Sequence, residues 1–332
     1  MKNAAAQHQE SGDALVQARG LVKHYRIKAG ALSSKKQTLK AVDGINLTVR
    51  TGETLGLVGE SGCGKSTLGR LILRLEEPTA GSITFNGTDI LSLNREEMRK
   101  MRGEMQIIFQ DPYSSLNPHK TVGWIISEPL RIHNKGNRKQ IRETVIELMN
   151  EVGLQPETYY RYPHEFSGGQ RQRIGIARAL ALNPSFIVAD EPVSALDVSI
   201  QGQIINLLND LQDRWNLTYL IIAHDLSVIY YISDRIAVMY LGVIMDLGPK
   251  EDFLKPPQHP YTEALVMSAP RLAVNGKGHY HEPLKGDLPS PVNPPSGCRF
   301  HTRCPYAEEI CTTTVPLLEE KSPGHFMACH FR

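Results

Sequence analysis

Residues 59–67 constrain this chain more than any other part of its sequence. They read Gly-Glu-Ser-Gly-Cys-Gly-Lys-Ser-Thr and fit the pattern G-x-x-x-x-G-K-[ST]. Glycines let successive backbone N–H groups point into such a loop, and the helix that follows adds the positive end of its dipole. An apolar run at 54–58 predicts a strand before the loop, and 68–75 predicts a helix after it. This context favours a cradle for the phosphates of a nucleoside triphosphate over a chance glycine-rich turn.

Several positions of this phosphate loop (residues 59–67) have an expected task. The amine of Lys65 can reach the β- and γ-phosphates, and the hydroxyl of Ser66 can coordinate Mg²⁺. Cys63 is expected to fill space within the loop. The residues predicted to bind the nucleotide here are Gly59, Ser61, Gly62, Cys63, Gly64, Lys65, Ser66 and Thr67.

Composition and charge narrow the class of protein. The 332 residues are 41% hydrophobic and 22% charged, as in an ordinary folded protein with a sizeable core. The 37 Lys and Arg residues against 35 Asp and Glu leave a net charge of +2, which gives no argument for a nucleic-acid partner. No apolar run approaches the ~18 residues that span a bilayer, and the N-terminal stretch lacks a signal-peptide core. We therefore expect a cytosolic protein that a membrane protein can recruit.

The order of the expected elements indicates an α/β fold. Apolar runs at 186–189, 219–223 and 236–240 have the composition of buried strands, and predicted helices separate them. Strands that alternate with helices predict a mainly parallel sheet with helices on both faces. The other local predictions are antiparallel strands within 14–49, a hairpin turn at 86–87, helices at 95–102, 122–153, 167–182 and 200–211, a strand at 105–109 and a loop at 112–118.

Polar residues follow several expected strands, where a phosphate site needs them. Asp190 ends a strand and suits Mg²⁺ or its water beside Ser66, and Glu191 can orient or deprotonate an attacking water. Gln110 can contact metal or water from another strand end, and His224 can touch the γ-phosphate. Singly, the acidic pair can be a solvated strand end and the histidine a hydrogen-bonded one. Their shared order along the chain favours a catalytic interpretation.

Two more segments complete the pattern. Residues 167–170 read Ser-Gly-Gly-Gln and open a helix, so they offer a second phosphate-binding end, although a simple cap and turn has the same sequence. Residues 194–197 read Ser-Ala-Leu-Asp and lie just beyond the acidic pair. The predicted nucleotide contacts from these segments are Ser167, Gly168, Gly169, Gln170 and Asp197.

With these motifs in place, residues 14–248 resemble the ATP-binding subunits of ABC transporters. The phosphate loop matches that family's Walker A motif, Gln110 the centre of its Q-loop, and residues 166–170 its signature. The signature commonly begins with Leu, where this chain has Phe166. That position packs and does not contact phosphate, so we expect little effect.

The resemblance also assigns the remaining motifs. Asp190 ends the Walker B motif and Glu191 is then the catalytic glutamate, with the D-loop at 194–197 and the H-loop at His224. Tyr25 matches the aromatic residue that stacks on adenine in the family, although an ordinary strand aromatic would also fit there.

The family's architecture implies a P-loop ATPase with a RecA-like core, an antiparallel β subdomain and an α-helical signature subdomain. We expect a flexible tail at 1–13, a nucleotide-binding domain at 14–250 with its helical part at about 113–176, and a C-terminal extension at 251–332. ATP is the implied substrate, with Mg²⁺ held by Ser66, Gln110 and Asp190.

The resemblance further implies partners. ATPase domains of this family dimerise head to tail, and each ATP lies between one subunit's Walker motifs and the signature of the other. A single set of motifs here implies a second ATPase subunit, two transmembrane permeases and, indirectly, a solute-binding protein, with this chain on the cytoplasmic face of the inner membrane. A soluble ABC ATPase that acts on nucleic acid or ribosomes is the alternative from another class. The single cassette and near-neutral charge argue against that alternative.

The tail narrows the family. His259-Pro-Tyr-Thr262 leads into an expected helix at 263–268 and, with 287–298 and 303–305, resembles the extension of dipeptide and oligopeptide importers, most closely their second ATPase subunit. Nickel and glutathione importers share this extension, so the solute is expected to be a peptide, with those two as alternatives.

Four of the five cysteines, Cys298, Cys304, Cys311 and Cys329, lie in this tail with the spacing C-x5-C-x6-C-x17-C. In a cytosolic chain such a group suits Zn²⁺ or an iron–sulfur cluster better than disulfides, and the spacing lacks the close pairs usual for zinc. The resemblance implies a [4Fe-4S] cluster, with Zn²⁺ or no metal as alternatives. The nearby His301, His325 and His330 are interpreted as surface residues.

Overall fold

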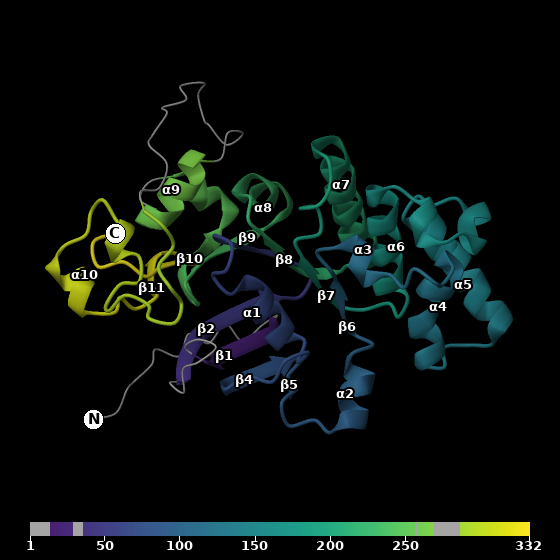
Figure 1. Ribbon diagram of the computed structural model, residues 1–332, viewed down its shortest axis with the longest axis horizontal. Coiled ribbons are helices and arrows are strands. Elements are labelled where there is room, and N and C mark those ends of the chain that lie inside the picture. Colours follow the sequence, from purple (N-terminus) through teal and green to yellow (C-terminus); the bar gives the residue numbers. More distant parts are fainter. Residues whose placement is uncertain (1–13, 29–35, 256–257, 269–285) are drawn as a thin grey trace.

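The computed structural model of the chain describes residues 14–28, 36–255, 258–268 and 286–332. Two sheets and the helices around them make up these residues (Figure 1). Within the described ranges, no helix combines the length and the apolar character needed to cross a membrane. The predicted tail at 1–13 lies outside the described residues.

The smaller sheet is antiparallel, with strand order β2-β1-β4-β5. Its strands are β1 (Ala14–Lys28), β2 (Lys36–Arg50), β4 (Ala80–Phe85) and β5 (Thr88–Asp89). Asn86 and Gly87 join β4 to β5 with φ angles of 46° and 75°. Two successive positive φ angles define a tight hairpin turn that Asn and Gly adopt at low cost. The predicted hairpin turn is confirmed.

The larger sheet has the strand order β11-β12-β10-β9-β3-β8-β7-β6. Its strands are β3 (Thr54–Val58), β6 (Met105–Ile108), β7 (Phe186–Asp190), β8 (Thr218–Ala223), β9 (Arg235–Tyr240), β10 (Val243–Pro249), β11 (Glu319–Ser322) and β12 (His325–Met327). The five strands from β9 to β6 pair in parallel, which confirms the predicted α/β sheet. Their carboxyl ends share one edge, where such sheets place their ligands.

The larger sheet is covered on both faces. Alternate side chains of β8 point into two different cores, because successive residues of a strand face opposite sides. Tyr219 and Ile221 pack with helices α4 to α8, whereas Leu220 and Ile222 pack with α1 and the smaller sheet. The helices around the cores are α1 (Lys65–Ile72), α2 (Arg95–Met101), α4 (Val122–Ile132), α5 (Arg138–Glu151), α6 (Gly168–Leu180), α7 (Val198–Trp215) and α8 (Leu226–Ile232).

Two local predictions between β6 and α6 are wrong. The expected loop at 112–118 contains the short helix α3 (Pro112–Ser115), because the Asp111 side chain caps it at the N–H groups of Tyr113 and Ser114. The expected helix at 122–153 is two helices. It breaks after α4, where the next helix starts with its own cap at Asn137. The short 3₁₀ helices η1 (Pro156–Tyr160) and η2 (Pro163–Glu165) lead from there into α6.

The C-terminal region continues the larger sheet. Strand β12 pairs with β10 in antiparallel fashion, with Asp246 opposite Met327. Figure 1 shows residues 286–332, in yellow, beside β10 at the end of the sheet away from β6. Its helices are η3 (Lys250–Leu254), α9 (Pro260–Ser268), η4 (His301–Arg303) and α10 (Glu309–Thr313). The division near residue 250 stays a prediction, and strand pairing crosses it.

A buried carboxylate fastens this region to the sheet. Asp246 on β10 is fully buried, and its oxygens accept hydrogen bonds from the Nε2 of His325 (2.6 Å), the hydroxyl of Thr262 (2.7 Å) and the N–H of His259 (3.3 Å). The interpretation of His325 as a surface residue is therefore wrong. Its imidazole is buried because it is the partner of a carboxylate that sequence spacing does not reveal.

Candidate functional site

The phosphate loop leaves β3 at the carboxyl edge of the larger sheet and ends in α1. A Cβ atom at Gly59 would lie 2.1 Å from the carbonyl oxygen of Met239, and one at Gly64 would lie 2.0 Å from that of Ala41. Only glycine fits where backbone approaches this closely. The amine of Lys65 donates to the carbonyl oxygens of Gly59 (2.7 Å) and Glu60 (3.1 Å). The loop is thus closed on itself, with its lysine folded inward.

The first residue pair at this edge suits a divalent cation. The hydroxyl of Ser66, in the first turn of α1, donates to Asp190 at the end of β7 over 2.7 Å. Asp190 is buried, and burial raises the pKa of its carboxyl group. A cation beside a buried carboxylate offsets this cost of burial. Hydroxyl and carboxylate oxygens are also the ligands that Mg²⁺ prefers, so the pair fits the predicted Mg²⁺.

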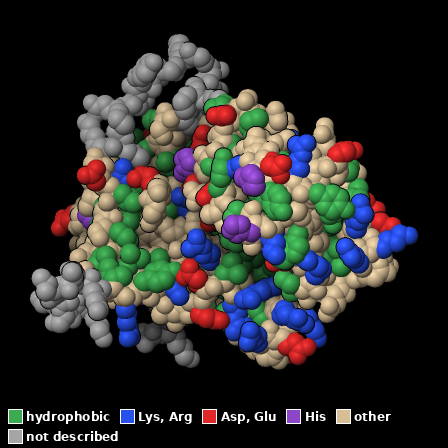
Figure 2. Space-filling model, turned by 45° about the vertical axis from the view of Figure 1, so that its right-hand side comes forward, with side chains coloured by type: hydrophobic (Ala, Val, Ile, Leu, Met, Phe, Trp, Pro, Cys, Tyr) green, Lys and Arg blue, Asp and Glu red, His purple; other side chains and the backbone are tan. Residues whose placement is uncertain are grey.

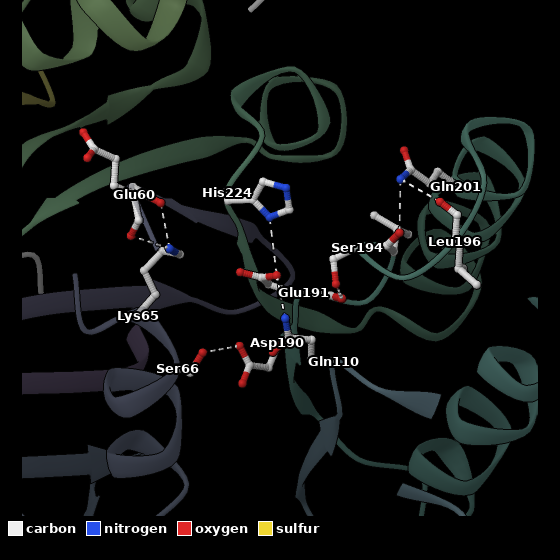
Figure 3. A network of polar contacts seen from close by, with 12 residues as sticks. Glu60, Lys65, Ser66, Gln110, Asp190, Glu191, Ser194, Leu196, Gln201 and His224 are labelled. Carbon is white, nitrogen blue, oxygen red and sulfur yellow. Dashed lines mark hydrogen bonds and ion pairs between the residues drawn. The ribbon is translucent and has the colours of Figure 1, made fainter. Parts of the chain in front are cut away.

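A second group of side chains converges on Glu191 (Figure 3). Oε2 of Glu191 accepts a hydrogen bond from Nε2 of Gln110 (2.9 Å) and lies 3.4 Å from Nδ1 of His224. These residues follow β6, β7 and β8, so the parallel sheet brings together what the sequence separates. Glu191 has a φ of 47°. This left-handed backbone conformation is unfavourable in free energy for any residue that carries a side chain. Such strain is typical of a functional position.

Hydrogen bonds from the side chains of Ser194 and Gln201 hold the predicted D-loop at 194–197 in place. The hydroxyl of Ser194 donates to the carbonyl of Glu191 (3.1 Å), and Nε2 of Gln201 donates to the carbonyls of Val193 (3.2 Å) and Leu196 (3.0 Å). Asp197 precedes α7, is exposed and makes no side-chain cap to that helix. The sequence did not single out Gln201, because its role depends on the fold of the preceding loop.

The predicted signature lies at the start of α6. Ser167 caps this helix, and Oε1 of Gln170 accepts a hydrogen bond from the N–H of Ser167 (3.0 Å), which confirms the predicted cap. A Cβ atom at Gly169 would lie 2.5 Å from Cγ2 of Ile200 on α7, so this glycine allows α6 and α7 to pack closely. Among the described residues, no hydrogen bond or ion pair joins 167–170 to the phosphate loop.

Tyr25 lies on β1 beside α1. Its hydroxyl donates to Glu76, the amine of Lys23 lies 5.0 Å from the centre of its ring, and burial together with Glu76 raises its pKa. The structure therefore places the hydroxyl of Tyr25 beside Glu76, just after α1, and stacking on adenine stays a prediction.

The four tail cysteines converge on one cavity of about 30 Å³. The N–H of Cys298 donates to the carbonyl of Cys311 (2.8 Å), and Cys304 and Cys329 complete the lining. Burial, with a smaller contribution from the neighbouring thiols, raises the pKa of Cys298 to about 11. All four are free thiols. In the described part of the chain, no three His, Cys, Asp or Glu side chains are close enough to form a ready metal site.

Comparisons with known proteins agree with this geometry. Residues 42–194 match the family described as ABC transporter, and residues 245–311 match the family described as Oligopeptide/dipeptide transporter, C-terminal region. The oligopeptide transport ATP-binding protein AppF of Bacillus subtilis (strain 168) is 54% identical over 320 residues, which are 96% of this chain and 97% of that relative.

Solved structures show the same fold. The dimeric post-hydrolysis structure of the ATP-binding cassette MJ0796 bound to ADP and Pi is 28% identical, has a TM-score of 0.63 and covers 71% of this chain and 98% of its own. The structure of cbiO1 from Clostridium perfringens, part of the ABC transporter complex cbiONQ, is 26% identical, with a TM-score of 0.64 and coverage of 74% and 92%. This chain belongs to the family of ABC transporter ATP-binding subunits, with the C-terminal region that oligopeptide and dipeptide transporters carry.

Proposed function

We propose that this chain hydrolyses ATP at its phosphate loop and that this hydrolysis drives the import of dipeptides or oligopeptides through membrane permeases. The observation that carries the proposal is the convergence of Ser66, Asp190 and Glu191 at the carboxyl edge of the parallel sheet, beside the phosphate loop. They come from the start of α1 and the end of β7, and together they suit phosphoryl transfer to water.

Each side chain has a task in that reaction. ATP would lie along the phosphate loop, where Lys65 leaves its backbone partners for the β- and γ-phosphates. Ser66, Gln110 and Asp190 would hold Mg²⁺, which supplies positive charge to the phosphate oxygens. Glu191 would orient the attacking water and accept its proton.

The remaining residues of the set act on the γ-phosphate and on the base. His224 would contact the γ-phosphate through its free nitrogen while its Nδ1 stays near Glu191 (3.4 Å). Tyr25 would stack on adenine.

The chain supplies half of an ATP site. The signature residues Ser167 to Gln170 make no described hydrogen bond or ion pair to the phosphate loop of their own chain, and Asp197 is exposed. We infer that a second ATPase subunit binds head to tail and places its signature opposite this phosphate loop, while residues 167–170 complete the site of the partner. Helix-start N–H groups suit this second contact with phosphate.

Two permease subunits are the further partners. Figure 2 shows hydrophobic side chains exposed among basic ones on the side of the molecule where α3 to α6 lie. Exposed aromatic residues flank Gln110: Phe109 is 41% exposed and Tyr113 is 64% exposed. Apolar rings next to a catalytic glutamine suit a membrane partner that senses the state of the nucleotide. The chain would then lie on the cytoplasmic face of the inner membrane, held there by the permeases.

Peptide is the proposed solute because the relative from Bacillus subtilis carries oligopeptide transport in its name. Deletion of the gene in its own organism tests this directly. We expect growth on peptides as the sole source of an essential amino acid to fail, and the wild-type gene to restore it. Unchanged growth on peptides, with loss of nickel or glutathione uptake, would contradict the proposal and favour those solutes.

We also propose that the four tail cysteines hold a [4Fe-4S] cluster, with Zn²⁺ as the alternative occupant. Their convergence on one cavity supports a shared ligand, because four cysteine thiolates are the set that holds a [4Fe-4S] cluster. The thiols would have to move closer together around a cluster. Cluster binding would release the protons of the ligating thiols and stabilise the folded extension.

Anaerobic purification followed by iron and sulfide assays tests the cluster. We expect about four iron and four sulfide ions per chain, and loss of most of both in Cys304→Ser. The matched control, Cys63→Ser, lies in the phosphate loop and should keep the iron. Stoichiometric zinc without iron would show that the cysteines hold Zn²⁺ and not the cluster. Neither iron nor zinc in the wild-type protein would reject both occupants.

A further inference from the structure

The C-terminal region holds the phosphate loop from outside through Glu60. Its backbone N–H donates to the hydroxyl of Tyr261 on α9 over 2.9 Å. Its carboxylate accepts two hydrogen bonds from Nη1 of Arg303, of 2.8 and 3.1 Å. Its carbonyl oxygen accepts from Lys65 (3.1 Å). All three polar parts of Glu60 are therefore occupied, and two of the partners lie more than 200 positions further along the chain.

Both partners from the C-terminal region are themselves fixed in place. Tyr261 is fully buried, with its ring edge-on to Tyr240 at 4.8 Å and against Phe300 at 5.3 Å. The side chain of Arg303 is only 7% exposed, and it also donates to the hydroxyl of Tyr240 over 3.4 Å. Side chains packed on all sides have little freedom to follow a moving loop. They hold Glu60 where it is.

A simpler explanation is that these contacts only attach the C-terminal region to the core. That region is already attached at other points: the Asp246 network, the pairing of β12 with β10, and the ion pair of Arg299 with Asp43. Attachment therefore does not require Glu60. The contacts to Glu60 differ from the others because they end on the loop that binds phosphate.

A loop whose backbone is already held in one conformation loses less entropy when a ligand binds. If Glu60 is released, the loop must be ordered again for each nucleotide. The N–H of Glu60 would also lose a buried partner. Both effects lower the affinity for nucleotide without removing any group that contacts the phosphates.

We propose that Tyr261 and Arg303 are positioning residues that preset the phosphate loop through Glu60, so that the C-terminal region determines how tightly the core binds nucleotide. This inference rests on the proposed function in one respect, the identity of the ligand as ATP. We call the contacts of Tyr261 and Arg303 with Glu60 the clamp. The cysteine cavity lies next to the clamp, since Phe300 lines the cavity and Arg303 directly precedes Cys304.

Hydrogen–deuterium exchange of the nucleotide-free full-length protein tests the positioning without relying on ATP. Exchange in peptides that cover residues 59–64 should rise about fivefold in Tyr261→Phe and in Arg303→Gln. Exchange in β12 should stay as in the wild type. The matched controls are Tyr231→Phe, whose exposed hydroxyl contacts Asn206, and Arg214→Gln, whose guanidinium pairs with Glu151. Neither control should change the loop.

Titration with Mg²⁺ and a fluorescent ATP analogue completes the test. We expect the dissociation constant to rise about 3- to 10-fold in Tyr261→Phe and Arg303→Gln, and Arg303→Lys to recover part of the loss. Folded variants with wild-type loop exchange and affinity would overturn the proposal, as would an equal rise of exchange in β12. If loop exchange rises in these variants but the wild-type protein binds no ATP, the positioning role is upheld and the proposed function is rejected.

Discussion

Glu191→Gln is expected to abolish ATP hydrolysis and to preserve ATP binding. The amide keeps the size of the side chain and can still bond to Gln110, but it cannot accept a proton from the attacking water. Loss of a general base lowers the rate by about 10²- to 10⁴-fold. The measurement is steady-state phosphate release from the assembled complex, together with equilibrium binding of ATP to the same preparation.

Ser194→Ala is the matched control. The Ser194 hydroxyl donates to the carbonyl of Glu191 and not to its carboxylate, so its removal should lower the rate only a few-fold. Glu191→Gln with more than a tenth of the wild-type rate would remove Glu191 from the role of base. Weakened ATP binding in that variant would instead assign it to nucleotide recognition.

Asp246→Ala is expected to detach the C-terminal region from the larger sheet. The variant leaves the imidazole of His325, the hydroxyl of Thr262 and the N–H of His259 buried without their acceptor. Removing one partner of a buried ionic network costs about 3–5 kcal/mol. Limited proteolysis should then cut the chain after residue 250 far faster than in the wild type.

The control for this variant is Glu263→Ala on α9. Glu263 pairs with Arg332 over 2.7 Å, and both side chains are about a quarter exposed. Partly exposed pairs contribute at most about 1 kcal/mol, so proteolysis should change little. Equal cleavage of the two variants would show that Asp246 does not anchor the region.

The hydrogen-bond network of Asp246 also predicts how the docking of the C-terminal region on the larger sheet depends on pH. The hydrogen bond to Asp246 raises the pKa of His325, so its contribution is complete below about pH 6.5 and is lost as pH rises through the higher folded pKa. Burial lowers the pKa of His259 to about 4, so its contribution is lost as pH falls from about 6.5 towards 4. Docking should therefore be strongest near pH 6.5, and Asp246→Ala should remove the loss above it.

The phosphate loop and the proposed catalytic residues were predictable because the information is local. A strand, a glycine-rich loop and a helix follow one another within a short stretch around Lys65. Asp190, Glu191 and His224 stand at strand ends, and the ends of parallel strands meet at one edge. Once the strands were placed, their convergence followed without any knowledge of tertiary contacts.

The clamp on Glu60 was not predictable in the same way. Tyr261 and Arg303 come from segments that reach the phosphate loop only through the path of the folded C-terminal region. His325 was misplaced for the same reason, because its partner Asp246 lies on a distant strand. Side chains that act across such separations carry no periodicity or spacing that a linear sequence can reveal.

The most direct test of the central claim is uptake of a labelled tripeptide by a strain that lacks this gene. The wild-type gene should restore uptake, and the Glu191→Gln gene should not, although its product accumulates and binds ATP. Uptake restored by Glu191→Gln, or uptake that never depended on the gene, would contradict the claim that hydrolysis by this chain drives peptide import.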